Sequence, residues 1–213
     1  TDPSLSVPSD MEFEAESADG ASAGGVEIAA FLASATADDI ADADPTLTHD
    51  APAIFPLGQT VVTFTATDDS GNDTMESTTL TIVDSTGPDL IAPDDLVVEA
   101  NVAGGAEATL AAIMAFLDGA SATDLVDADP MITHDAPTLF PAGETTVTFT
   151  ATDGAGNQSE ETATVTVTVS YDFGDAPEGY PVTRSDDGAR HFAGSLALGS
   201  AVDVDADGQA DAD

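Results

Sequence analysis

The stretch Val62-Thr-Phe-Thr-Ala-Thr-Asp68 recurs 85 residues later as Val147-Thr-Phe-Thr-Ala-Thr-Asp153. In both copies apolar residues alternate with threonine, which is the period-2 pattern of a strand with one buried face. A Gly-Asn pair follows each copy, at residues 71–72 and 156–157, and a second alternating stretch comes after it. The pattern predicts one β-hairpin in each copy.

The same offset aligns residues 1–85 with residues 86–170 without a gap. Solenoid repeats are usually about 20–50 residues long, so this longer period predicts one small domain per copy. Several short strands separated by turns indicate an all-β fold made of tandem β-sandwiches. Alanine, leucine and methionine are strong helix formers, so a short helical turn is expected within each copy, at residues 26–32 and 107–117. Residues 171–213 differ in composition and form a third, acidic segment.

The charge balance excludes several classes of partner. The chain has 2 basic and 41 acidic residues and a net charge of −39. Binding to nucleic acid requires lysine and arginine to neutralise phosphates, so nucleic acid is not an expected partner. The longest apolar stretches are shorter than the roughly 20 residues of a membrane-spanning helix, which predicts no membrane insertion. The absence of cysteine excludes disulfides, thiolate catalysis and cysteine-ligated zinc.

A complete catalytic pattern is also missing from the sequence. Residues 20–24 read Gly-Ala-Ser-Ala-Gly, which has the Gly-x-Ser-x-Gly spacing, but no His-based relay, phosphate-binding loop or dinucleotide glycine pattern accompanies it. We therefore expect that the protein is not an enzyme.

Carboxylates are concentrated in loops that a β-sandwich would gather at its ends. Two unit charges about 4 Å apart repel by roughly 1 kcal/mol in water and about 4 kcal/mol at an effective dielectric of 20, so such clusters favour a counterion. Hard oxygen ligands in irregular geometry favour Ca²⁺ over Mg²⁺. The alternative is that these residues only form turns, with their side chains bonded to local N–H groups. The candidate Ca²⁺ ligands in the two copies are Asp42, Asp44, Asp68, Asn72, Asp84, Asp127, Asp129, Asp153 and Asn157.

A further candidate loop lies in the acidic segment. Asp203-x-Asp-x-Asp-Gly208 matches positions 1, 3, 5 and 6 of a calcium loop, and Asp211 matches position 9. Position 12 falls after Asp213, so Asp213, another segment or a neighbouring subunit would have to supply the closing carboxylate. A frayed acidic tail is the alternative. The candidate ligands here are Asp203, Asp205, Asp207 and Asp211.

The histidines favour a structural interpretation. His49 and His134 occupy equivalent positions in the two copies, each beside an aspartate. We expect side-chain hydrogen bonding near a strand rather than metal ligation, and the same interpretation applies to His191.

In each copy the motifs follow the order Pro-x-Asp, Asp-x-Asp-Pro, Phe-Pro-x-Gly, and Val-Thr-Phe-Thr-Ala-Thr-Asp-x-x-Gly-Asn. This order resembles the hyalin repeat (HYR) domain, and the resemblance implies tandem immunoglobulin-like sandwiches in an extracellular adhesive protein. Animal members often carry cysteines, so a bacterial surface version is the better comparison. Residues 171–213 resemble the opening of the GEVED-type module of bacterial surface proteins. The Asp-x-Asp loops beside the linker at residues 84–88 are similar to the interdomain calcium sites of cadherins.

These features predict a calcium-stabilised extracellular structural or adhesive protein, acting as a rod-like stalk or head-to-tail fibre subunit of a bacterial surface. Its partners would be other copies of itself, in a head-to-tail homopolymer, or adjoining domains of a larger surface protein. An alternative is a ligand- or carbohydrate-binding accessory module of a secreted protein from a halophile, although a sequence without tryptophan offers few aromatic platforms. A halophile's solvation could also explain the acidity, and it predicts carboxylates spread over all surfaces.

Overall fold

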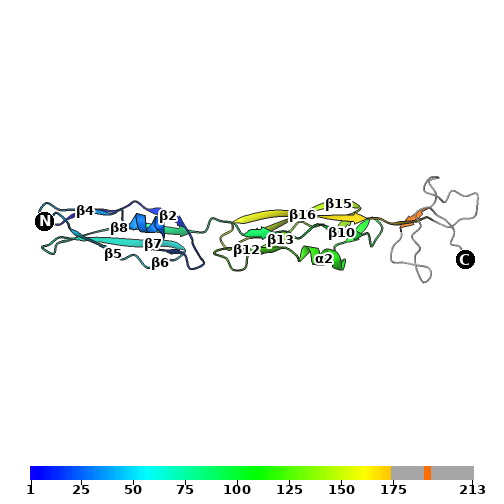
Figure 1. Cartoon of the computed structure of the whole chain (residues 1–213), viewed down its shortest axis with the longest axis horizontal. Helices are drawn as coiled ribbons and strands as arrows, with labels where there is room; N and C mark the ends of the chain where they lie inside the picture. The colour runs from blue at the N-terminus through cyan, green and yellow to red at the C-terminus, as the bar shows by residue number, and fades with distance from the viewer. Residues whose placement is uncertain (174–189, 193–213) are drawn as a thin grey trace, which may run out of the picture. The chain divides into compact units, whose positions relative to one another are not determined.

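The structure is a computed structural model that describes residues 1–173 and 190–192. The chain divides into two compact units (Figure 1). The first unit comprises residues 1–88, 123–130 and 152–158, and the second comprises residues 89–122, 131–151 and the described residues from 159 onward. Strands dominate, and the helices of the described residues are α1 (Val26–Leu32) and α2 (Ala111–Leu117), so the all-β class is confirmed. Neither helix is long and apolar enough to cross a membrane.

The first unit is built on a four-stranded sheet of order β2-β8-β7-β5. Its central hairpin joins β7 (Gly58–Thr67) to β8 (Asp73–Val83), as the alternating stretches predict. One edge strand, β5 (Thr46–His49), runs antiparallel to β7. The other edge strand, β2 (Met11–Glu14), runs parallel to β8, with Phe13 opposite Ile82. The first and last strands of the sheet are therefore direct neighbours.

One face of this sheet carries the hydrophobic core. Along β7, Val62 is 0% exposed while its neighbour Val61 is 62% exposed, because successive side chains point to opposite faces. Helix α1, predicted at these residues, covers the buried face, and the Phe31 ring lies edge-on to Phe13 at 5.6 Å. The rest of the opposing layer consists of short antiparallel pairs rather than a broad sheet. These pairs are β1 (Ser4–Ser6) with β4 (Thr36–Asp38), and β3 (Ala21–Ser22) with β6 (Ile54–Phe55).

The second unit repeats this arrangement with the sheet order β10-β16-β15-β13. These strands are β10 (Leu96–Glu99), β13 (Met131–His134), β15 (Gly143–Thr152) and β16 (Gln158–Thr168), and β10 runs parallel to β16. Two short pairs complete it, namely β11 (Gly105–Glu107) with β14 (Leu139–Pro141), and β9 (Asp89–Ile91) with β12 (Ser121–Thr123). Its core consists mainly of aliphatic side chains, and Phe140 and Phe149 are fully buried aromatic residues within it.

Helix α2 starts later than the sequence predicts. Residues 107–117 were expected to be helical, but Glu107 ends strand β11, and its N–H donates to Asn101 Oδ1 at 2.9 Å. The Leu110 N–H then bonds the Glu107 carbonyl at 2.9 Å, so the chain turns before the helix begins at Ala111. Pairing with β14 thus overrides the helix propensity of this stretch.

Both units depend on a glycine where β3 or β11 approaches its partner strand. Gly20 has a φ of 109°, and a Cβ at this position would lie 1.9 Å from the Phe55 carbonyl oxygen. Gly105 meets the Phe140 carbonyl at the same distance. No residue with a side chain fits either position without displacing backbone.

The start of the acidic segment forms a separate two-stranded sheet. Strand β17 (Tyr171–Phe173) pairs antiparallel with β18 (Arg190–Phe192), and Asp172 lies opposite His191. The predicted calcium loop at Asp203, Asp205, Asp207 and Asp211 lies outside the described residues, and so do the remaining residues of the GEVED-like segment. The calcium loop and the GEVED-like segment remain predictions.

Candidate metal centre

Three carboxylates of the first unit converge on one point. Oxygen atoms of Asp84, Asp124 and Asp153 all lie within 4.8 Å of one another. Asp84 directly follows β8, Asp124 follows β12, and Asp153 follows β15, so each of the three segments that build this unit contributes one group. Within residues 1–173 and 190–192 this is the one set of three or more such side chains with metal-binding spacing.

Asp153 is held by the turn that follows its strand. Its carboxylate is nearly buried, at 6% exposure. Oδ1 accepts the Gly156 N–H at 2.7 Å and the Asn157 N–H at 2.8 Å, while Oδ2 accepts from Asn157 Nδ2 at 2.9 Å. The same Asn157 amide also donates to the Asp84 backbone carbonyl at 3.1 Å. Asn157 therefore fixes the position of Asp153 relative to Asp84.

Asp124 is held by its own loop. Its Oδ1 accepts the N–H groups of Val126 at 2.8 Å and Asp127 at 2.7 Å. Val126 in turn packs, partly buried, against the core of the first unit. The loop thus places the Asp124 carboxylate near the other two while an apolar side chain anchors the loop.

The carboxylates of this group repel one another. Burial, and then the nearby charges of Asp153 and Asp124, raise the pKa of Asp84 above its ordinary value. For Asp153, burial acts in the same direction, but hydrogen bonds from the Asn157 side chain and from backbone N–H groups outweigh it and lower the pKa. The chain has no lysine, and its two arginines are at positions 184 and 190. A bound cation would relieve the repulsion that raises the pKa of Asp84.

The donor set fits a hard divalent ion. Ca²⁺ is bound by oxygen atoms at about 2.3–2.6 Å, so its ligand oxygens lie roughly 3–5 Å apart, which is the spacing of these three carboxylates. Each carboxylate oxygen has two lone pairs. Oδ1 of Asp124 and Oδ1 of Asp153 each already accept two N–H groups, whereas Oδ2 of Asp153 accepts one and keeps a lone pair for an ion. Asp84, Asp124 and Asp153 would hold the ion and would join the three segments that carry them.

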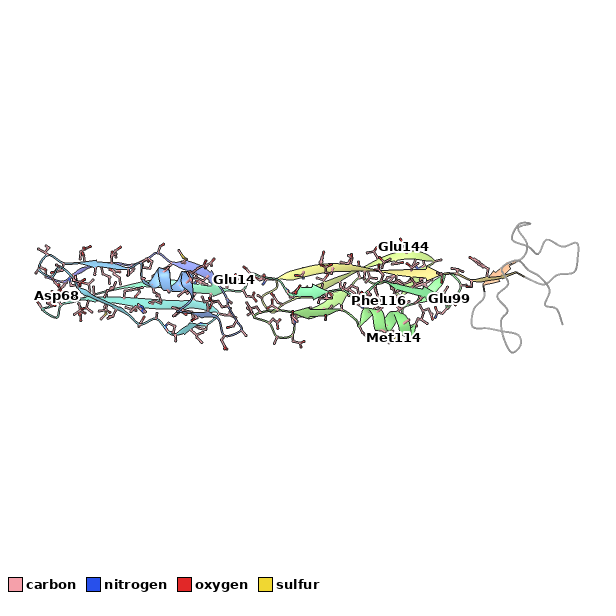
Figure 2. All side chains as sticks on the ribbon, viewed as in Figure 1. Glu14, Asp68, Glu99, Met114, Phe116 and Glu144 are labelled. Atoms are coloured by element: carbon pink, nitrogen blue, oxygen red, sulfur yellow. The ribbon has the colours of Figure 1, made fainter. Side chains whose placement is uncertain are left out.

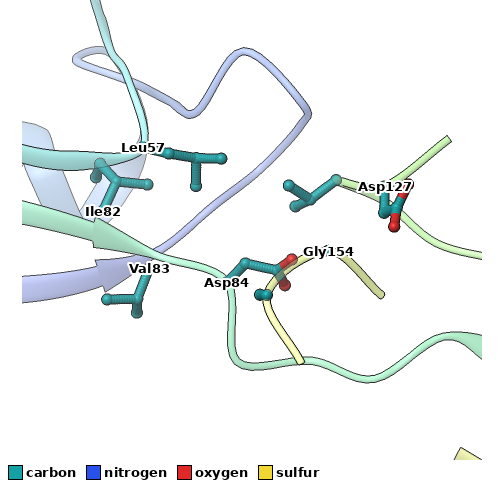
Figure 3. A pocket seen from close by; sticks show the side chains of 8 residues that line it. Leu57, Ile82, Val83, Asp84, Asp127 and Gly154 are labelled. Atoms are coloured by element: carbon teal, nitrogen blue, oxygen red, sulfur yellow. The ribbon is translucent and has the colours of Figure 1, made fainter. Parts of the chain in front are cut away.

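A pocket of about 510 Å³ lies beside this group (Figure 3). One wall of the pocket consists of Leu57, which directly precedes β7, and of Ile82 and Val83 at the end of β8. Asp84 continues this wall, and residues 126–127 and 154–155 form the opposite side. The loops that carry Asp124 and Asp153 therefore meet an aliphatic surface as well as a carboxylate.

The other candidate ligands occupy the loops in which they were expected. At the end of the first unit that carries Asp68 (Figure 2), the Asp69 N–H donates to Asp42 Oδ2 at 3.0 Å, so the loops at 39–44 and 68–72 adjoin. Their carboxylates accept main-chain N–H groups, as the turn-forming alternative describes. Asp42 Oδ1 accepts from the Asp44 N–H, and Asp68 Oδ1 accepts from the N–H groups of Ser70 and Asn72. Asp127 accepts from the Asp129 N–H in the same way, and neither belongs to the group of three.

The sequence analysis did not select Asp124. Its counterpart 85 residues earlier is Asp39, and both open an Asp-x-x-Asp stretch that ends at Asp42 or Asp127. Asp39 Oδ1 likewise accepts two N–H groups, from Ala41 at 2.7 Å and Asp42 at 2.9 Å. Repetition of this aspartate was the signal that could have identified it.

The two equivalent histidines act as predicted. The ring nitrogen Nδ1 of His49 accepts the Ala51 N–H at 3.3 Å, and that of His134 accepts the Ala136 N–H at the same distance. Each ring also lies edge-on to a core phenylalanine, Phe64 or Phe149. A structural role is confirmed for both side chains.

Comparison with known proteins gives three similarities. The family model of the HYR domain matches residues 88–169. Hyalin from Lytechinus variegatus is 31% identical over 119 residues, which is 54% of this chain and 22% of hyalin. The ectodomain of human Desmocollin-1 aligns with 81% of this chain and 42% of its own at a TM-score of 0.27 and 11% identity. The chain thus spans about a fifth of the relative it matches, and the predicted resemblance to the HYR domain is confirmed for residues 88–169.

Proposed function

We propose that this chain is a calcium-stabilised extracellular structural or adhesive protein, a stalk or fibre subunit of a bacterial surface. The HYR match and the similarity to hyalin support an extracellular domain of the adhesion type. By the repeat, residues 1–85 are a second domain of this kind. The role is non-enzymatic.

The observation that carries the calcium proposal is the convergence of Asp84, Asp124 and Asp153 from three segments of one unit. Without a counterion, folding brings three like charges together, which costs free energy. Ca²⁺ bound to the folded unit would shift the folding equilibrium by mass action and would fasten both loops to the end of β8. Calcium thus has the role of a structural crosslink between segments.

A thermal melt of the full chain tests this proposal. We expect millimolar Ca²⁺ to raise the melting temperature well above its value in EGTA, and Mg²⁺ to raise it much less, because Mg²⁺ demands octahedral geometry and keeps its waters. Equal melting temperatures in Ca²⁺ and in EGTA at the same NaCl concentration would contradict the proposal and would favour general screening of an acidic surface.

A matched pair of variants assigns the effect to the site. Asp124→Asn should remove most of the Ca²⁺-dependent rise, since asparagine keeps the oxygen that accepts the two turn N–H groups but loses the charge. Asp39→Asn changes the equivalent aspartate, which has the same turn hydrogen bonds and lies outside the group of three. It should keep the Ca²⁺ response. An equal loss in both variants would show that the ion binds elsewhere.

A further inference from the structure

One end of the first unit presents two adjoining loops, residues 38–44 and 68–72, which we name the N-terminal loop face. The Asp69 N–H bonded to Asp42 Oδ2 makes them one surface. Ile40, at the tip of the first loop, is 97% exposed. Beside it, a pocket of about 310 Å³ is lined by Thr1, Asp2, Ser4, Asp38, Asp39 and Ile40. Ile40 is thus fully accessible next to a hollow, and its counterpart in the second copy, Leu125, is 65% exposed.

The same two loops occur again 85 residues later, at residues 123–129 and 153–157, and there they have a partner surface. Within the first unit these later loops line the pocket with Leu57, Ile82, Val83 and Asp84. Val126 packs against that unit's core, and Asn157 Nδ2 donates to the Asp84 carbonyl. Their partner surface is therefore the closing end of a sheet, formed by aliphatic side chains, a carboxylate and a main-chain acceptor.

The N-terminal loop face has the same internal construction as its seated counterpart. Asp39 Oδ1 accepts the N–H groups of residues 41 and 42, as Asp124 Oδ1 accepts those of residues 126 and 127. Asn72 Nδ2 donates to Asp68 Oδ2 at 2.7 Å, as Asn157 Nδ2 donates to Asp153 Oδ2. The Asn157 amide also donates a hydrogen bond to the Asp84 carbonyl. On the N-terminal loop face, the Asn72 amide occupies the position equivalent to that of Asn157.

We propose that the N-terminal loop face docks the closing end of another unit of the same kind, joined directly ahead of Thr1, whose last strand ends as β8 does in an Ile-Val-Asp sequence. The repeat gives the register, since Thr1 corresponds to Thr86 and Pro3 to Pro88. The aspartate at the end of that unit's last strand would lie close to Asp39 and Asp68, in the same way that Asp84 lies close to Asp124 and Asp153. The proposal rests on the structural role proposed above, but it does not require calcium.

The chain's own second unit is a poorer partner for this face. The residues that correspond to Leu57, Ile82 and Asp84 there are Ala142, Val167 and Val169. The end of that sheet therefore lacks the carboxylate and presents smaller side chains. Between the two predicted arrangements, this difference favours an adjoining domain over a head-to-tail homopolymer.

The test is an extended protein in which a copy of residues 1–85 is joined directly ahead of Thr1 of the full chain. Backbone hydrogen exchange is measured for residues 38–44 and 68–72 in the original and extended proteins, each in Ca²⁺ and in EGTA. We expect exchange in the extended protein to slow by about tenfold at these loops. Ala41→Asp in the original copy should restore fast exchange, because Ala41 corresponds to Val126, while Val26→Asp, a change at an exposed aliphatic residue, should not. Unchanged exchange, with the added unit itself protected, would overturn the proposal.

Crosslinking supplies a second readout, because the chain has no cysteine of its own. With Ala41→Cys in the original copy and Leu57→Cys in the added copy, a short bismaleimide should join the two sites. The internal standard is the pair Val126→Cys and Leu57→Cys in the unextended chain, whose side chains line one pocket. Crosslinking of the standard without crosslinking of the test pair would overturn the proposal.

Two further outcomes would distinguish a different occupant of this face from a failure of the calcium proposal. If the loops of the unextended chain become protected as its concentration rises, the occupant is a second copy and the proposed partner is wrong. If the unextended chain shows no Ca²⁺-dependent melting but the extended protein shows protection in EGTA, the calcium proposal fails and the docking proposal stands.

Discussion

At the residue scale, aspartate has two different tasks in this protein. Asp39, Asp42, Asp68 and Asp127 accept main-chain N–H groups and shape the loops that contain them. Asp84 has the opposite character, because burial and neighbouring carboxylates raise its pKa. Its negative charge is therefore unfavourable in the folded state unless a cation is present.

Asp84→Asn should accordingly have opposite effects with and without calcium. A folded-state pKa above the unfolded value means that ionisation of Asp84 weakens folding as pH rises through that folded value. At pH 7 in EGTA the variant should therefore melt a few degrees above the wild type, and this gain should vanish near pH 3. In millimolar Ca²⁺ it should melt below the wild type. Glu161→Gln, which removes one exposed charge within β16, is the control, and an identical response of both variants would contradict the assignment.

Asp68 should show the reverse pH dependence. Hydrogen bonds from the Asn72 side chain and from the backbone N–H groups of Asn72 and Ser70 lower its pKa. Its contribution is therefore present above the unfolded pKa, about 3.8, and is lost as pH falls through the lower folded value. Asp68→Asn should reduce stability at pH 7, since an amide donor would face the Asn72 amide. Urea midpoints between pH 6 and pH 2 should fall less steeply for the variant, and parallel curves would refute this role.

At the element scale, the sequence predicts the elements that have a strict period and misplaces those that depend on partners. Strands β7 and β8 follow from the alternation of apolar residues with threonine, and α1 lies where composition predicts it. The start of α2 was wrong because residues 105–107 pair with β14, a contact between distant segments. Asp84 and Asp153 were candidates from loop composition, but Asp124 joins them only because the chain returns to the first unit. A local pattern does not encode that return.

A matched pair of valines in β7 tests the one-sided burial of the sheet. Val62→Ala removes two methyl groups from a fully buried position and should cost about 2 kcal/mol. Val61→Ala, one residue earlier and on the outer face, should cost less than about 1 kcal/mol, which is the range of strand propensity. Chemical denaturation of both variants provides the comparison. Equal losses would mean that both faces of this sheet are covered.

At the scale of the whole molecule, the net charge of −39 acts on every part of the fold. Like charges spread over a folded surface repel one another and weaken the compact state. This general repulsion is distinct from the local repulsion at Asp84, because dissolved salt screens exposed charges more effectively than partly buried ones.

Monovalent salt should therefore stabilise the protein without selectivity. Between about 10 mM and 1 M salt, the screening length falls from about 30 Å to about 3 Å, so the melting temperature in EGTA should rise steadily over that range. NaCl and KCl should act alike, and Asp124→Asn should respond as the wild type does. A salt response that disappears in Asp124→Asn would instead assign the effect to the carboxylate site.

The parallel pairing of β2 with β8 determines how tension would act on the first unit. Because the two strands run in the same direction, the chain enters β2 at one end of the ladder and leaves β8 at the other. A pull on these two exits slides one strand along the other and loads the interstrand hydrogen bonds simultaneously, whereas an antiparallel pair pulled from one end would open one bond at a time. In the structural role proposed above, the four residue pairs between Met11–Glu14 and residues 80–83 would act as a mechanical clamp against such a pull.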